Sequence, residues 1–340
     1  MKPLGMVVAA AAGTLAMLAA GLAQGQSQRV FFQVATGSTG GTYFPIGEAL
    51  AGIVSHPPGL TRCEARGVCG PPGLIVTALT SDGAVANLLA VDAGEVDSGL
   101  AQSNVVADAV AGRGAFRQAG PQRHIRAIAG LFPETLQLVV AAKSHIAKVG
   151  DLNGKRVSIG ADGSGTSVIA RAVLSAYGIS EHRLKLRRDV SDRNGDLLQR
   201  GEIDAFFFVG SAPAPLIGDL LTRGKARLIP IDGRGRRRLL ERVPSLSVDI
   251  IAAGIYSRTG TVQTVSCRAL WVVKDSAPSG TVYGIVRALF HPANRLLLDN
   301  GPPSAPRIRL DEAVNGLTAP LHPGALRFYR EMNLALPPQK

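Results

Sequence analysis

Aromatic residues and cysteines are few in this chain. Phe, Trp and Tyr together make up 5% of the 340 residues, and Trp occurs once. A surface that stacks on nucleic-acid bases needs several exposed rings, so the composition does not favour such a partner. The hydrophobic content of 46% is nevertheless ample for sizeable cores. The composition therefore indicates a folded protein with mainly aliphatic cores.

Acidic residues are also in the minority. Lys and Arg number 37 against 25 Asp and Glu, which gives a formal net charge of +12. This balance suits an anionic small ligand, nucleic acid or an acidic membrane surface, and does not choose among them. The densest basic run, Arg234 and 236–238, has no interleaved aromatic residue and no second cluster beside it. It predicts a solvated surface segment, with nucleic acid as the weaker alternative, and we expect no nucleic-acid partner.

Motifs for metals, cofactors and common catalytic sites are missing. The six histidines show no HExxH or paired spacing, and the three cysteines form no CxxC. No complete GxSxG, GxxxxGK[ST] or GxGxxG motif occurs. We therefore expect no metal, no cofactor and no enzymatic activity. The enzyme alternative is an exported serine hydrolase, in which Ser164 would join a distant His and Asp.

The N-terminus carries a targeting pattern. Lys2 precedes an alanine-rich apolar stretch over residues 7–20, and small residues follow at 21–23. This pattern predicts a cleavable secretory signal peptide over residues 1–23 and a periplasmic mature chain from Gln24. A retained membrane anchor is the alternative, although the stretch is shorter than the roughly 20 apolar residues that span a bilayer.

Export makes a disulfide possible. Cys63 and Cys69 lie in one loop between Pro-Pro-Gly sequences at 57–59 and 71–73. In an oxidising compartment two nearby thiols pair readily, so we expect a local Cys63–Cys69 disulfide. Cys267 is left over in an apolar run, which predicts a buried structural thiol.

The hydrophobic pattern alternates between strands and helices. A strand over 29–35, a glycine-rich turn over 36–42 and a helix over 45–54 begin the chain, and strand 156–159, turn 160–166 and helix 167–177 repeat this order. Further segments have the same alternation: strands 74–79, 97–102 and 203–209, and helix 84–93. This alternation predicts an α/β fold with a doubly wound sheet.

The chain is expected to cross between two lobes. Strand-like segments over 125–131 and 136–142 flank Pro133, which we expect to split one central strand into two pieces. Strand 269–273 and helix 282–289 would bring the chain back. The predicted division is a first lobe of residues 24–131 with 268–340, and a second lobe of residues 132–267. Two α/β lobes joined in this way enclose a ligand cleft between them.

The two glycine-rich turns are the candidate ligand site. Each turn leads into a helix N-terminus, where free N–H groups and the helix dipole attract a carboxylate or phosphate. Ser38, Thr39 and Thr42 would add hydroxyl groups from one lobe, and Ser164 and Thr166 from the other. The alternative role of these hydroxyls is ordinary helix capping.

Arg171 is a further candidate in the second unit. It lies about one turn inside the helix that follows Thr166, from which a guanidinium group can reach a ligand carboxylate with two hydrogen bonds. An ion pair on the solvated face of the helix is the alternative.

Several motifs resemble one family of transport receptors. Residues 37–47, GSTGGTYFPIG, are similar to the N-terminal signature of the TAXI-family receptors of tripartite ATP-independent periplasmic (TRAP) transporters. Further similar motifs follow in the same order at 81–87, 94–97, 102–105, 151–157, 163–166 and 201–207. The resemblance covers about residues 30–295.

The resemblance implies a fold, a function and a set of ligand-binding residues. It implies a two-lobed type II periplasmic-binding-protein fold that captures a small carboxylate or amino acid, such as glutamate, and delivers it to an ion-gradient-driven permease. The same fold serving as a sensor for a signalling partner is the alternative. The residues carried over are Thr39, Gly40, Gly41 and Tyr43 on the first lobe, Ser81, Asn87, Gln102 and Ser103 on the same wall, and Ser164, Gly165 and Thr166 on the second lobe.

Overall fold

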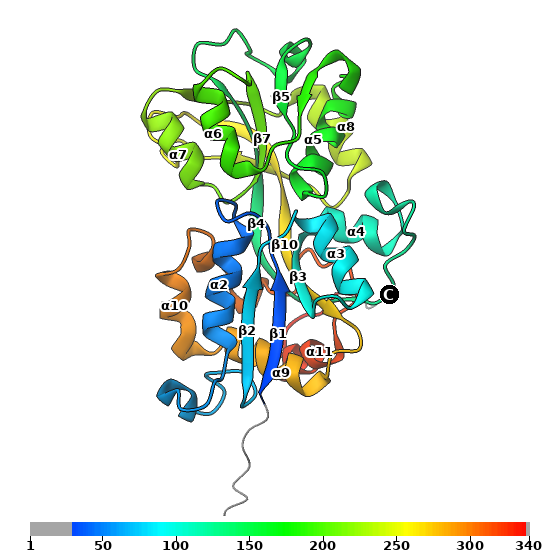
Figure 1. The fold of residues 1–340 in the computed structure, drawn as a ribbon, viewed down its shortest axis with the longest axis vertical. Coiled ribbons are helices and arrows are strands. Elements are labelled where there is room, and N and C mark those ends of the chain that lie inside the picture. The colour runs from blue at the N-terminus through cyan, green and yellow to red at the C-terminus, as the bar shows by residue number, and fades with distance from the viewer. Residues whose placement is uncertain (1–28, 338–340) are drawn as a thin grey trace, which may run out of the picture.

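The computed structural model describes residues 29–337, which form a mixed α/β structure around one sheet of ten strands (Figure 1). The main strand order is β2-β1-β3-β10-β4-β7-β5-β6, with β8 beside β4 and β9 beside β10. The predicted signal peptide, residues 1–23, lies outside the described residues. Among those residues, no helix has the length and apolar character that crossing a membrane requires.

The lower half in Figure 1 contains the first α/β unit and the C-terminal helices. Strand β1 pairs in parallel with β2 and β3, as the alternation of strand and helix in the sequence predicts. The elements of this half are β1 (Val30–Ala35), α2 (Tyr43–Val54), β2 (Leu74–Leu79), α3 (Ala84–Ala93), β3 (Ser98–Gln102), α4 (Ser103–Val110), α9 (Ser279–Leu289), α10 (Arg295–Asp299) and α11 (Pro323–Glu331).

The upper half contains the second α/β unit. Strand β5 pairs in parallel with β6 and β7. The elements are β5 (Arg156–Ser158), α5 (Gly165–Ala176), β6 (Lys185–Arg187), α6 (Ser191–Gln199), β7 (Ala205–Gly210), α7 (Pro215–Thr222), β8 (Ala226–Ile229), α8 (Gly233–Arg242) and β9 (Ser247–Ile251). The basic run of the sequence forms α8, where Arg234, Arg237 and Arg238 are exposed.

Two long antiparallel strands join the halves: β4 (Ile125–Ala141) and β10 (Val262–Lys274) (Figure 1). Each strand contributes side chains to two hydrophobic cores, one in each half. On β4, Phe132 packs in a core of the lower half and Leu136 in a core of the upper half. On β10 the same change falls between Cys267 and Ala269. The hydrophobic cores therefore meet at the middle of these strands.

The predicted break at Pro133 is wrong, because β4 runs unbroken from Ile125 to Ala141. Pro133 lies opposite Arg268 of β10, and the register shifts between Arg268 and Leu270. A local irregularity of this kind lets a strand hold a proline, which has no N–H to give to the ladder.

The cysteine predictions are confirmed. Cys63 and Cys69 form a disulfide with a Cα–Cα distance of 5.2 Å. It closes the loop that follows α2, and the valine between the two cysteines, Val68, is buried with them. Cys267 is a free thiol, buried in β10.

Candidate functional site

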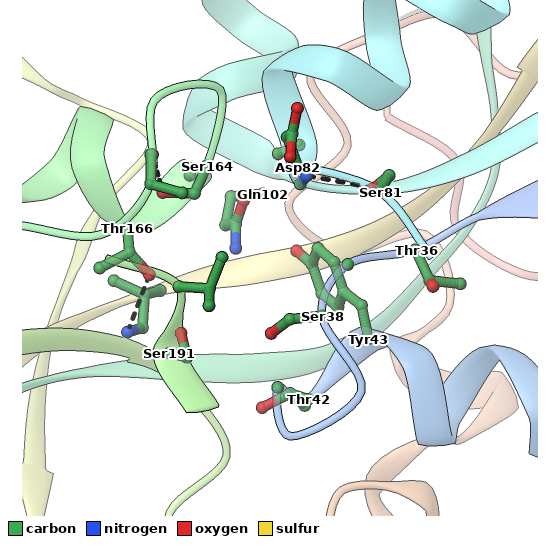
Figure 2. A pocket seen from close by; sticks show the side chains of 18 of the residues that line it. Thr36, Ser38, Thr42, Tyr43, Ser81, Asp82, Gln102, Ser164, Thr166 and Ser191 are labelled. Atoms are coloured by element: carbon green, nitrogen blue, oxygen red, sulfur yellow. Dashed lines mark hydrogen bonds between the residues drawn. The ribbon is translucent and has the colours of Figure 1, made fainter. Parts of the chain in front are cut away.

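A pocket of about 70 Å³ lies between the two halves (Figure 2). Five helices begin at or beside it: α2, α3 and α4 from the lower half, and α5 and α6 from the upper half. Residues at their first turns, together with side chains from β4 and β7, form its wall. The lining residues are Thr36, Gly37, Ser38, Gly41, Thr42, Tyr43, Ser81, Asp82, Gly83, Ala84, Gln102, Glu134, Ala161, Ser164, Gly165, Thr166, Val190, Ser191, Phe208 and Val209.

Four of these helices begin without a side-chain cap. The residues at the N-cap positions of α2, α3, α4 and α6 accept no capping hydrogen bond from the helix through their side chains. The first turns of a helix carry N–H groups with no partner inside the helix and the positive end of the helix dipole. The pocket therefore has backbone donors suited to a small anionic group.

The turn before α2 holds a carboxylate that belongs to the protein. Asp192, near the start of α6, accepts hydrogen bonds from Ser38 Oγ at 2.8 Å, Gly40 N at 3.1 Å and Thr39 Oγ1 at 3.3 Å. The predicted carboxylate seat is thus occupied by a side chain from the other half. Thr39 and Gly40 do not line this pocket. They border a separate, more apolar cavity.

The turn before α5 is fixed by helix capping. Ser164 Oγ accepts a hydrogen bond from Ser167 N at 3.1 Å and donates one to Ala161 O at 2.7 Å. Thr166 Oγ1 accepts from Val209 N at 3.4 Å. The capping alternative therefore describes Ser164. No histidine is among the described residues that line the pocket, so Ser164 lacks the histidine of a Ser-His-Asp triad there.

The two halves touch directly across the pocket. Val85 N donates a hydrogen bond to Gly163 O at 2.9 Å, and Ser211 N donates one to Thr42 Oγ1 at 3.2 Å. The side-chain amide of Gln102 lies against Gly165, where a Cβ atom would stand 1.8 Å from Gln102 Oε1. The structure is consequently a closed arrangement in which both turns meet the opposite half.

The floor of the pocket is a buried acid with two polar neighbours. Glu134 is 1% exposed, on β4. Tyr43 Oη donates a hydrogen bond to Glu134 Oε2 at 2.5 Å, and Gln102 Nε2 approaches Glu134 Oε1 at 3.5 Å. Gln102 Oε1 has no hydrogen-bond partner among the residues that the structure describes. Figure 2 shows Tyr43 and Gln102 extending into the same space from separate elements.

Burial raises the pKa of Glu134 to about 8, although the hydrogen bonds from Tyr43 and Gln102 oppose the shift. Burial and the neighbouring Glu134 also hold the pKa of Tyr43 well above its usual value, and burial does the same for Cys267. No Lys, Arg or His is among the described lining residues to stabilise a carboxylate. Near neutral pH the floor is therefore mainly uncharged.

Most of the predicted ligand residues meet in this pocket. Its wall includes Ser38, Gly41, Tyr43, Ser81, Gln102, Ser164, Gly165 and Thr166. Asn87 is buried behind the wall, where its Nδ2 donates to Thr36 O and Leu100 O and its Oδ1 accepts from Ser81 Oγ. Ser103 Oγ accepts from Arg268 N behind the same wall. These two side chains support the pocket without lining it.

Arg171 lies elsewhere. Its guanidinium group donates to Glu181 Oε1 at 3.0 Å and to Asp162 Oδ1 at 3.2 Å. It borders another cavity, beside Asn104 and Asp108 of α4. The ion pair weighed in the sequence analysis is the arrangement found, so we leave Arg171 out of the proposed site.

Several residues of the site were not predicted from the sequence, and Glu134 and Asp192 matter most among them. Glu134 had a usable signal, because it is an acidic residue in an otherwise apolar strand segment beside Pro133. Asp192 had none, because its partners are more than 150 positions away in the chain. Within residues 29–337, no group of three or more His, Cys, Asp or Glu side chains is placed to hold a metal ion.

The wild-type protein should lose stability as the pH rises, and we expect Glu134→Gln to lack this loss. The carboxyl ionises near 4.5 when unfolded and near 8 when folded, so between these values only the folded state keeps the proton. The contribution of Glu134 to the free energy of unfolding is therefore full below pH 4.5. It declines toward pH 8 by up to about 1.4 kcal/mol per pH unit. Denaturant unfolding of both proteins at several pH values between about 5 and 8 measures this slope.

Glu95→Gln, at an exposed position after α3, is the matched control and should keep the wild-type slope. An equal slope in wild type and Glu134→Gln would mean that Glu134 is already ionised in the folded protein.

Comparison with known proteins identifies the family. The sequence matches the model of the NMT1-like family over residues 34–332, a span that includes both halves and the whole pocket. The chain belongs to the NMT1-like family.

Solved structures place this NMT1-like chain among periplasmic binding proteins in fold. The periplasmic binding protein BugD superposes with a TM-score of 0.53 at 11% identity, over 91% of this chain and 95% of BugD. MatC from Rhodopseudomonas palustris, solved with bound malate, gives a TM-score of 0.51 at 12% identity, over 80% of this chain and 88% of MatC. These likenesses confirm the predicted α/β fold of periplasmic binding proteins. The narrower TAXI and TRAP assignment remains a prediction.

Proposed function

We propose that this NMT1-like protein is an exported receptor that captures a small carboxylate or amino acid, glutamate-like in size and charge, by closing its two lobes. The observation that carries the proposal is the meeting of five helix N-termini from both halves around one pocket. Backbone donors on both sides let one ligand hold the closed form together. The lobes of the proposal are residues 24–131 with 268–340, and 132–267.

A small organic acid fits the chemistry of the wall. Backbone N–H groups and helix dipoles attract anions without a basic side chain, and the described lining residues include no Lys or Arg. The small volume favours a compact ligand. MatC, whose fold is similar, was solved with malate, and this supports including dicarboxylates among the solutes to test.

The partner in this proposal is the membrane permease of a TRAP transporter, which would take the solute from the periplasm using an ion gradient. The collinear TAXI-like motifs support this partner. A sensor that reports the same solute to a signalling protein is the second candidate. The two differ in one measurement, because only a transport receptor should make uptake into permease-containing vesicles dependent on its presence.

A thermal-shift screen of residues 24–340 tests the receptor function. A ligand that binds only the folded state raises the melting temperature, so we expect a rise with at least one dicarboxylate, amino acid or other small organic acid. Mixing the stabilising solute with the protein should leave that solute chemically unchanged. A flat response to every acid, or turnover that depends on Ser164, would contradict the proposal.

A further inference from the structure

Glu134 is a titratable group at the centre of the pocket that a simple anion receptor does not need. Its carboxyl is buried on β4, at the place where the chain passes from one half to the other. The helix N-termini around it attract anions, whereas an ionised Glu134 would repel them. The same small pocket thus contains two opposite electrostatic influences, and the protonation state of Glu134 decides between them.

The groups that face Glu134 leave its charge uncompensated. Tyr43 approaches from α2, Gln102 from the end of β3 and Cys267 from the paired strand β10, and none of these is cationic. From the upper half, the pocket is lined by Thr166 of α5 and by Phe208 and Val209 of β7, which carry no charge. The other ionisable lining residue is Asp82, before α3, and it is acidic as well.

We propose that the pocket binds its carboxylate solute only while Glu134 is protonated, so that a proton accompanies each solute into the closed protein. This inference rests on the proposed function, and it adds a pH-dependent control of the same site. A neutral Glu134 removes the repulsion and supplies an O–H donor beside the anion. Deprotonation turns that donor into a second negative charge in a small, buried space.

The local geometry favours Oε1 as the atom that holds the proton. Tyr43 Oη already donates to Oε2, whereas the contact from Gln102 Nε2 to Oε1 is long. The Gln102 amide nitrogen is directed toward the middle of the pocket in Figure 2, so it and the Oε1 hydroxyl are placed to donate to one carboxylate. The proton comes from solvent, and no other bond forms or breaks.

The pH dependence of binding follows from the same arrangement. Burial raises the pKa of Glu134 to about 8 against the opposing hydrogen bonds from Tyr43 and Gln102, and a bound anion raises it further, since like charges disfavour ionisation. At neutral pH the protein is therefore already prepared to bind. Above about pH 8 the free protein loses the proton, and each further pH unit should weaken binding about tenfold.

Isothermal titration calorimetry tests the inference with L-glutamate and L-malate as probes. We expect the Kd to be flat between about pH 6 and 7.5 and to rise about tenfold per unit above pH 8. Titrations above pH 8, in two buffers with different ionisation enthalpies, should show uptake approaching one proton per solute. Binding that releases protons, or that strengthens as the pH rises, would overturn the inference, because Glu134 would then pair with a cation.

Two variants separate this inference from the receptor function. Glu134→Gln keeps the shape and stays neutral, so its Kd should lose the rise above pH 8. Tyr43→Phe removes a hydrogen bond that lowers the pKa of Glu134, so the onset should move to higher pH. The inference is overturned, and the receptor function is not, if the Kd of Glu134→Gln still rises tenfold per pH unit and the onset of the rise in Tyr43→Phe stays at the wild-type pH. A failure of both probes, and of every acid in the thermal-shift screen, to bind wild type and Glu134→Gln at any pH would overturn the carboxylate receptor as well.

Discussion

Replacing Gly165 with Ala should weaken solute binding by about 5- to 150-fold. Gly165 is the first residue of α5, and a Cβ there would stand 1.8 Å from Gln102 Oε1 and 2.4 Å from Gln102 Cδ. Gln102 is buried, so its amide can move away only into the space of the ligand, or the halves must stay apart. Overpacking of this kind costs about 1–3 kcal/mol, which corresponds to that loss of affinity.

Small-angle scattering and calorimetry of the variant measure closure and binding separately. Gly280→Ala is the control, because Gly280 lies in the first turn of α9 with open space around its Cα, and it should behave as wild type. Combining Gly165→Ala with Gln102→Ala removes the clashing amide and should restore the closed dimensions. Unchanged affinity and dimensions in Gly165→Ala itself would show that the close contact does not limit closure.

Asp192→Ala should speed solute dissociation and lower affinity by about 5- to 30-fold. The Asp192 carboxylate accepts three hydrogen bonds from the turn before α2, on the opposite half. Hydrogen bonds to a charged group contribute about 1.5–3 kcal/mol each when well buried, but this contact is exposed to water and salt. A total of about 1–2 kcal/mol for the group is therefore reasonable.

Stopped-flow measurement of dissociation tests this expectation, because losing a contact that forms only on closure should act mainly on the rate of opening. Asp196→Ala is the control, since Asp196 is an exposed acid one turn further along α6. Asp192→Asn should keep part of the wild-type affinity, because one acceptor oxygen remains in its side chain. Equal dissociation rates for Asp192→Ala and Asp196→Ala would exclude Asp192 as an interlobe latch.

The sequence was informative where structure depends on neighbours in the chain. The turns at 36–42 and 160–166 could be recognised because a few neighbouring residues carry the signal: glycine adopts backbone conformations that other residues avoid, and small hydroxyl residues bond to the nearby backbone. The Cys63–Cys69 disulfide was predictable for the same reason, as only five residues separate the cysteines. The turn signals account for Ser38, Ser164 and Thr166 on the wall of the pocket, and the family resemblance supplied the other predicted residues found there.

The sequence was less informative where remote residues meet. Ser38 was assigned to a ligand because nothing in the sequence shows that Asp192 would reach its hydroxyl. Arg171 could be placed on a helix, but the choice between a ligand and Glu181 depends on the direction of one side chain in space. The role of Glu134 depends on burial by elements from three distant parts of the chain. Pro133 gave a misleading signal, because a shift of register in the partner strand accommodates it.

The position of β10 in the sheet also determines when the protein can finish folding. β10 lies between β3 and β4, so strands made early in synthesis cannot join the rest of the sheet until residues 269–273 have been made and delivered. The upper half, a continuous stretch of chain between β4 and β10, can form before that. Such late, long-range pairing slows folding. In the exported receptor proposed above, this strand order keeps the sheet incomplete until most of the chain has been synthesised.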